Sequence, residues 1–170
     1  MLNELGTIHA FSGAHGTGKT TAVFSLAARL KRDLPLARVG IVQEVAGKSP
    51  FPINRDTSEK GQLWIFSSQI AAELSAAADF HRVVSDRCAV DAIAYTQVAG
   101  FDRLAEGMIA LYREHLPLYR EIRVLSPRAG LLVPDGMRDV DSAFQQEVHA
   151  RIVALHRRLG GPVTFDCGAL

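Results

Sequence analysis

The chain has 170 residues, which suits about one domain and excludes two unrelated catalytic domains. Hydrophobic residues make up 48% and charged residues 22%, which excludes disordered, collagen-like and coiled-coil proteins. The formal net charge of +1 excludes a global field that would attract nucleic acid or a membrane surface. We therefore expect a single domain over residues 1–170, in which a local site holds any polyanion.

Short β-branched runs alternate with helical patterns along the chain. Strands bounded by glycine or proline are expected at Thr7–Phe11, Arg38–Val45, Arg82–Ser85, Ile122–Leu125 and Pro162–Phe165. Helices are expected at Lys19–Arg32, Thr57–Asp79 (with Asp56 as a candidate cap), Val90–Ala99, Asp102–Glu114 and Asp141–Leu159. This alternation predicts an α/β fold, with a doubly wound parallel sheet covered by helices on both faces.

The strongest motif follows the first expected strand. Residues 13–20, GAHGTGKT, match the phosphate-binding pattern G-x-x-x-x-G-K-[ST] and open the first expected helix. The glycines let main-chain N–H groups converge on phosphate oxygens, and the positive end of the helix supports the same charge. Lys19 is expected to reach the β and γ phosphates of ATP, and Thr20 to ligate Mg²⁺. The expected ATP-binding set is Gly13, Ala14, His15, Gly16, Thr17, Gly18, Lys19, Thr20 and Thr21.

Two classes of P-loop protein lack their signals in this sequence. A GTPase needs an N-K-x-D guanine motif, but the K-x-D tripeptide, Lys31-Arg32-Asp33, has no asparagine before it. A motor ATPase carries Asp-Glu after an apolar strand, and here Arg87 follows Asp86 in the place of that glutamate. The sequence therefore lacks the expected glutamate that would activate water for hydrolysis, which favours a kinase.

Three charged residues are expected at the carboxyl ends of the second and third expected strands, where ligands bind in such sheets. Asp86 is a candidate Mg²⁺ ligand beside Thr20, and Arg87 a candidate partner of a substrate phosphate or of the transferring group. Glu44 is a candidate ligand of a ribose hydroxyl, or the base that takes its proton. Alternatively, Asp86 and Arg87 form a surface salt bridge, and the Glu44 carboxylate only faces solvent.

Further candidates surround these residues. Asp91 and Tyr95 are expected to line the acceptor pocket, although Asp91 suits a helix cap equally well. Residues 47–55 form a proline-containing loop, from which Asn54 and Arg55 are expected to contact the substrate. Gln62 and Trp64 are further candidates for recognition of a base, with core packing the competing role for Trp64.

A mobile lid is expected over about residues 126–140, where prolines and glycines punctuate the chain. Arg128 and Arg138 are expected to reach the transferring phosphoryl group from this lid, with an inert loop as the alternative. His15 fills a variable position of the phosphate loop, and packing explains His149 and His156 on one expected helix. The two cysteines are too few for a disulfide scaffold, so a reducing, cytoplasmic setting is expected.

The chain resembles a small P-loop nucleoside or nucleotide kinase of the AAA-domain family that includes ribosylnicotinamide kinase domains. The resemblance rests on residues 13–20, Glu44, residues 62–66 with Glu73, Asp86-Arg87 with Asp91 and Ala94-Tyr95, and residues 135–138. Thymidylate kinases are similar more distantly, since Gln43-Glu44-Val45 replaces their Arg-Glu-Pro. The resemblance implies a P-loop NTPase fold with five parallel strands in the order 2-3-1-4-5.

The expected function is transfer of the γ-phosphoryl group from ATP, with Mg²⁺, to a nucleoside or nucleotide-like acceptor. A kinase acting on hydroxymethyluracil in DNA is an alternative that the near-zero net charge disfavours. A nucleotide-dependent binding switch with a protein partner is another. We expect no membrane association and either a monomer or a homodimer.

Overall fold

The structure, a computed structural model, describes residues 5–127 and 142–166. Strands and helices alternate, as the sequence predicts, and the described connections contain three short 3-10 helices. The elements in chain order are β1 (Thr7–Ser12), α1 (Lys19–Asp33), β2 (Val39–Val42), η1 (Ala46–Lys48), η2 (Asn54–Asp56), α2 (Glu59–Asp79), β3 (Arg82–Asp86), α3 (Ala89–Val98), α4 (Asp102–His115), η3 (Leu116–Leu118), β4 (Tyr119–Val124), α5 (Ser142–Leu159) and β5 (Val163–Phe165).

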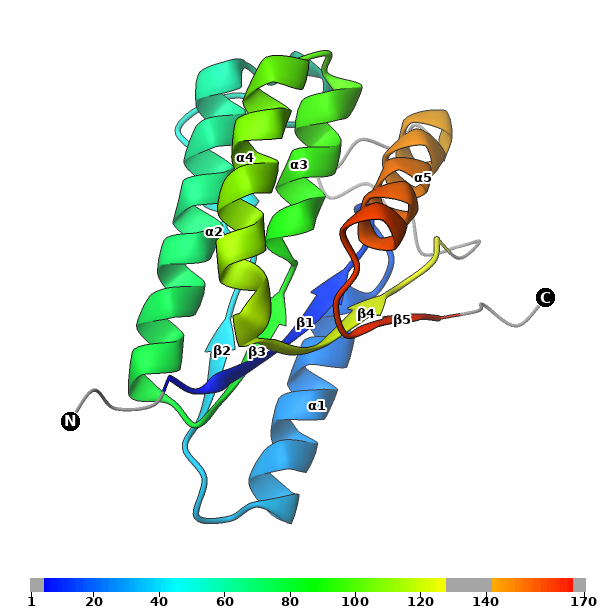
Figure 1. Ribbon diagram of the computed structural model, residues 1–170. Coiled ribbons are helices and arrows are strands. Elements are labelled where there is room, and N and C mark those ends of the chain that lie inside the picture. Colours follow the sequence, from blue (N-terminus) through cyan, green and yellow to red (C-terminus); the bar gives the residue numbers. More distant parts are fainter. Residues whose placement is uncertain (1–4, 128–141, 167–170) are drawn as a thin grey trace.

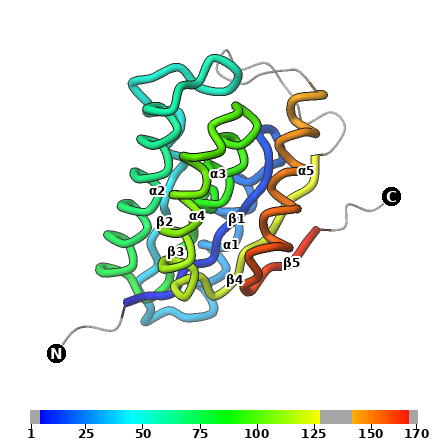
Figure 2. The backbone as a smooth tube through the Cα atoms, turned by 45° about the horizontal axis from the view of Figure 1, so that its top comes forward, coloured from blue at the N-terminus to red at the C-terminus, as the bar shows by residue number. Residues whose placement is uncertain are grey.

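The five strands form one parallel sheet in the order β2-β3-β1-β4-β5, which confirms the predicted topology. Helix α1 covers one face, and α2, α3, α4 and α5 lie on the other (Figure 1). Figure 2 shows α3 between α2 and α5, and it packs against both. The predicted arrangement of helices on both faces is therefore confirmed.

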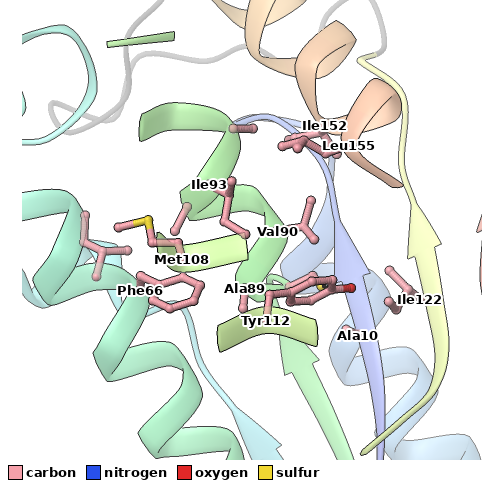
Figure 3. Close-up of a cluster of buried hydrophobic side chains, with 14 of the residues drawn as sticks. Ala10, Phe66, Ala89, Val90, Ile93, Met108, Tyr112, Ile122, Ile152 and Leu155 are labelled. Atoms are coloured by element: carbon pink, nitrogen blue, oxygen red, sulfur yellow. Dashed lines mark hydrogen bonds between the residues drawn. The ribbon is translucent and has the colours of Figure 1, made fainter. Parts of the chain in front are cut away.

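Two hydrophobic clusters hold the layers together. Phe11 and Val84 pack with α1 on one side of the sheet. On the other side, Ala10 and Ile122 of the sheet contribute to the cluster formed by α2, α3, α4 and α5, as Figure 3 shows. Adjacent residues Ala10 and Phe11 serve opposite faces because side chains alternate along a strand. The central strands are thus buried on both faces, as parallel sheets require.

Some element ends differ from the predicted ones, and each difference has a local cause. Helix α2 is capped by Ser58, whose side chain accepts a hydrogen bond from Gly61 N, because Asp56 lies in η2. Strand β2 ends at Val42 because the chain then turns toward η1, which leaves Glu44 beyond the strand. Strand β4 begins earlier than predicted, at Tyr119, immediately after η3.

The register brings chemically useful residues to one edge of the sheet. Phe11 of β1 pairs with Asp86 of β3, and Val42 of β2 pairs with Ser85. The neighbouring strands β2, β3 and β1 therefore end together, at the edge where parallel α/β sheets bind ligands. No helix in the described part of the chain is long and apolar enough to span a bilayer.

Candidate active site

The loop between β1 and α1 wraps as a phosphate-binding loop must. Gly13, Gly16 and Gly18 have φ values of 148°, 69° and 82°, a region that side chains rarely allow. A Cβ at Gly13 would also lie 2.6 Å from the carbonyl oxygen of Leu125. Glycine is therefore required at Gly13 both by its backbone conformation and by the lack of space.

Most of the loop's main-chain donors are available. Within the described residues, the N–H groups of residues 16–20 have no hydrogen-bond partner in the protein. Two predicted members of the cradle differ. Gly13 N donates to Asp91, with 3.3 Å to Oδ2, and His15 N lies 3.3 Å from the Tyr95 hydroxyl. These two amides anchor the loop, and residues 15–21 line the cavity where a phosphate is predicted.

Lys19 is folded back onto its own loop. Its Nζ donates to the carbonyl oxygens of Gly13 and Ala14, at 3.0 and 2.6 Å, and lies 3.2 Å from Thr17 Oγ1. Burial, assisted by the positive charge of Arg87, lowers the pKa of Lys19 to about 7. The Lys19 amine is therefore held close to the expected phosphate position, and it is only partly protonated at neutral pH.

Thr20 and Asp86 meet at the mouth of the loop. Thr20 Oγ1 donates to Asp86 Oδ2 at 2.6 Å, across the gap between α1 and the end of β3. A hydroxyl and a carboxylate are hard oxygen ligands, the type that Mg²⁺ takes from proteins when phosphates supply the rest. The described residues contain no group of three or more His, Cys, Asp or Glu that could hold a metal. The Thr20–Asp86 pair therefore fits a shared Mg²⁺ ion rather than an all-protein cage.

Arg87 and Glu44 form a tight ion pair beside the loop. Arg87 Nε and Nη2 both lie 2.6 Å from Glu44 Oε1, and Arg87 Nη1 lies 3.3 Å from Gly13 O. The φ of Arg87 is 113°, which is strained for a residue with a side chain and typically costs about 1–3 kcal/mol. Such strain persists where surrounding contacts outweigh it, and here the guanidinium is held by Glu44 and by Gly13 O.

Two adjacent cavities meet at these residues. The first, of about 230 Å³, follows the phosphate loop and is lined by residues 15–21, Glu44, Asp86 and Arg87. The second, of about 240 Å³, lies on the side of α2 and α3. His15, Glu44 and Arg87 line both cavities. A molecule in the second cavity would thus lie next to the end of a polyphosphate in the first.

Asp91 lines the second cavity and also supports the loop. It accepts hydrogen bonds from Ser12 Oγ and Gly13 N, while Cys88 holds the N-cap position of α3. Burial raises the pKa of Asp91 to about 6. His156 is buried in the packed interior, and its Nε2 also lies 2.9 Å from Ser12 Oγ. Burial lowers the pKa of His156 to about 4, which leaves it neutral at pH 7.

The residues predicted to recognise a base are only partly brought together. Asn54 and Gln62 line the second cavity. Arg55 is not among the described residues that line it, and its guanidinium lies 4.7 Å from the centre of the Phe144 ring. Trp64 packs against the hydrophobic core. Arg128 and Arg138, with most of the predicted lid, lie outside the described residues, and their roles remain predictions.

Sequence reasoning missed Gln69, which also lines the second cavity. A signal was present, because Gln69 follows Gln62 by two helical turns and so lies on the same face of α2. Ile53, Ile65 and Ala92 were missed too, and they give this cavity apolar walls. A cavity with apolar walls and a few polar groups is typical of a small-molecule site.

The fold and the loop together define the P-loop NTPase fold. The sequence matches the family described as AAA domain over residues 8–168, and the chain belongs to this family. No curated protein matches it at a significant level.

Solved structures show the same fold at low identity. NadR protein in complex with NR superposes with a TM-score of 0.69 and 18% identity, covering 98% of this chain and 48% of NadR. This chain thus spans about half the length of NadR. Deoxyadenosine kinase from M. mycoides with bound dATP gives a TM-score of 0.63 and 13% identity, covering 94% and 89%. Thymidylate kinase from Ehrlichia chaffeensis gives 0.61 and 14%, covering 94% and 86%.

Proposed function

We propose that this protein is a kinase that moves the γ-phosphoryl group of ATP to a nucleoside or nucleotide-like acceptor. The observation that carries the proposal is the junction of the two cavities at His15, Glu44 and Arg87. A triphosphate in the loop cavity and an acceptor in the second cavity would have their reacting ends side by side. Such positioning supplies a large part of catalysis in phosphoryl transfer. A solved NadR structure holds NAD and AMP-PNP, which supports nucleotide binding by this fold.

The loop would hold the donor through its free amides and through Lys19. Lys19 would exchange its bonds to Gly13 O and Ala14 O for phosphate oxygens. Thr20 and Asp86 would hold Mg²⁺, which when bound neutralises charge on the β and γ phosphates. Arg128 or Arg138 would complete this neutralisation from the proposed lid.

The acceptor determines which side chain completes the chemistry. With a hydroxyl acceptor, its oxygen bonds to the γ-phosphorus while the bond to the β–γ bridging oxygen breaks and ADP leaves. The hydroxyl proton passes to Glu44, which must first release Arg87. With a phosphate acceptor no base is needed, and Arg87 would neutralise the incoming charge. Glu44, Asn54, Arg55, Arg87 and Asp91 remain the proposed acceptor-binding residues.

A labelling experiment tests the proposal. ATP labelled at the γ-phosphate is incubated with nucleosides, nucleotides and DNA that contains hydroxymethyluracil. We expect a small acceptor to be labelled, and Lys19→Ala and Asp86→Asn to lower the rate at least 100-fold. Lys60→Ala, which removes an exposed lysine on α2, is the matched control and should retain the wild-type rate. Labelling of the DNA alone would show that the acceptor is a modified base in DNA and not a small molecule. ATP binding without any labelled acceptor would favour a nucleotide-dependent binding switch.

A further inference from the structure

An exposed stripe of four residues runs along α4. Arg103, Gly107, Leu111 and Glu114 follow one another at spacings of four, four and three residues, which places them on one face of the helix. All four are exposed, and Leu111 is 58% exposed. Within residues 5–127 and 142–166, neither Arg103 nor Glu114 forms an ion pair or a side-chain hydrogen bond. The described chain thus leaves the charged ends of this stripe without partners and its apolar centre open to solvent.

A groove of about 580 Å³ runs beside the stripe, between α4 and the neighbouring α2 (Figure 1). Apolar side chains and one glycine line most of it: Leu63, Leu104, Gly107, Met108 and Leu111. A Cβ at Gly107 would meet nothing within 4 Å, so there is room above this residue for a side chain from outside. Glu59 and Lys60 line the groove as well, and their opposite charges cancel. The stripe is thus bordered by an apolar hollow of no net charge.

The charges at the two ends of the stripe oppose the dipole of their own helix. Arg103 lies in the first turn of α4, near the positive end of the dipole, and Glu114 lies in the last turn, near the negative end. Both positions therefore destabilise the isolated helix slightly. A partner that brings a negative charge to Arg103 and a positive charge to Glu114 would compensate both.

A second copy of the same stripe has this charge pattern when the two helices run antiparallel. With a twofold axis at the level of Ile109, residues equally far on either side of the axis face each other. Arg103 then lies opposite the partner's Glu114, and Gly107 lies opposite the partner's Leu111. A parallel pair would instead place Arg103 against the partner's Arg103, where like charges repel. The charges therefore select both the occupant and its direction.

We propose that the stripe and groove of α4 form the contact between two copies of this chain, with their α4 helices antiparallel. Such a twofold contact is self-complementary, since each copy supplies the Leu111 side chain and the space above Gly107 that receives it. Glu106 and Arg113, on either side of the axis, would also face each other with opposite charges. This inference does not depend on the proposed kinase function.

The proposed contact is small, so we expect a weak dimer. Stable interfaces bury about 1,200–2,000 Å², and a single pair of helices with the edge of α2 lies at the low end of this range. We expect a dissociation constant on the order of 10 μM. Sedimentation velocity should therefore show mainly monomer at about 1 μM protein and mainly dimer at about 100 μM.

Charge reversal with remixing tests the contact directly. Arg103→Glu and Glu114→Arg each place like charges opposite each other across the axis, so each variant alone should remain monomeric at about 100 μM. In an equimolar mixture of the two variants, every such contact joins opposite charges again. The mixture should therefore regain the wild-type dimer, and so should the double variant.

Three further measurements exclude a general effect of the substitutions. Both reversals suit the dipole of α4, so circular dichroism should show no loss of helix in either variant. Arg151→Glu makes the same change of charge at an exposed position on α5, and it should dimerise like the wild type. Leu111→Ser removes the apolar centre of the contact and should raise the dissociation constant at least tenfold.

Three results would overturn the inference. A wild-type protein that stays monomeric up to about 100 μM has no such contact. Dimers in both single variants would place the contact on another surface. Monomeric variants that do not associate when mixed would exclude the antiparallel pairing. None of these results bears on phosphoryl transfer, which the labelling experiment tests separately.

Discussion

At the scale of single residues, the charge state of Lys19 should make the proposed nucleotide binding depend on pH. Burial lowers its pKa to about 7, so the neutral amine is favoured at pH 8. Phosphate oxygens favour the charged form, so binding should raise this pKa and take up a proton. Above pH 7 the affinity for ATP should therefore fall as the pH rises.

Calorimetry measures this proton directly. At pH 8, the heat of ATP binding should differ between phosphate and Tris buffers. The expected difference is that between the ionisation enthalpies of the two buffers, for about one proton taken up. Lys19→Met should abolish the difference, whereas Lys60→Met should keep it. Equal heats in both buffers for the wild-type protein would contradict the expected shift.

Glu44 separates the two kinds of acceptor, again at the residue scale. If the acceptor group is a hydroxyl, Glu44→Gln should lower kcat by roughly 100- to 10,000-fold, since the proton loses its base. If it is a phosphate, the loss should stay below about tenfold. Steady-state rates with the best acceptor distinguish the outcomes, and Glu59→Gln, at an exposed position on α2, is a suitable control.

The candidate site shows which residues a sequence reveals. The residues 13–20 are adjacent in the chain, so their spacing alone predicted a phosphate loop. Glu44 and Arg87 were found as residues at strand ends, but their ion pair was not, because it joins separate parts of the chain. Gln69 looks like an ordinary polar helix residue until α2 is packed against β3.

At the scale of secondary-structure elements, the turn after β1 depends on Gly13. Alanine there would meet both the strained φ of 148° and the Leu125 carbonyl. We expect Gly13→Ala to lower the free energy of unfolding by at least about 2 kcal/mol.

Gly107 offers a matched comparison for this substitution. It lies exposed within α4, and a Cβ there would meet nothing within 4 Å. Gly107→Ala should therefore raise the free energy of unfolding by about 0.5–1 kcal/mol. Urea denaturation of both variants provides the measurement, and equal effects would refute the role assigned to the turn.

The elements themselves were largely predictable because their hydrophobic spacing is local. The predictions were wrong at the ends of some elements, where a short 3-10 helix forms in place of the expected helix cap or strand. Asp56 was the predicted cap of α2, but η2 takes it up and Ser58 caps the helix instead. Strand β2 was predicted too long, since apolar Val45 looks like strand yet precedes η1.

At the scale of the whole molecule, ligand binding and stability should be coupled. Nucleotide bound at 100 times its Kd adds about 2.7 kcal/mol to the free energy of unfolding. For a chain of this size, that corresponds to a rise in Tm of roughly 5–10 °C. Thermal melts with MgATP should show this rise in the wild type and in Lys60→Ala, and lose it in Lys19→Ala. A rise that survives in Lys19→Ala would place the nucleotide elsewhere.

For the proposed kinase, the ion pair between Arg87 and Glu44 should restrict hydrolysis of ATP by water. Glu44 Oε1 already holds two guanidinium contacts, which oppose its use as a base toward a water molecule. Only an acceptor that competes for the Arg87 guanidinium would release the Glu44 carboxylate. The same ion pair that would serve the proposed reaction would thereby suppress hydrolysis of ATP when no acceptor is bound.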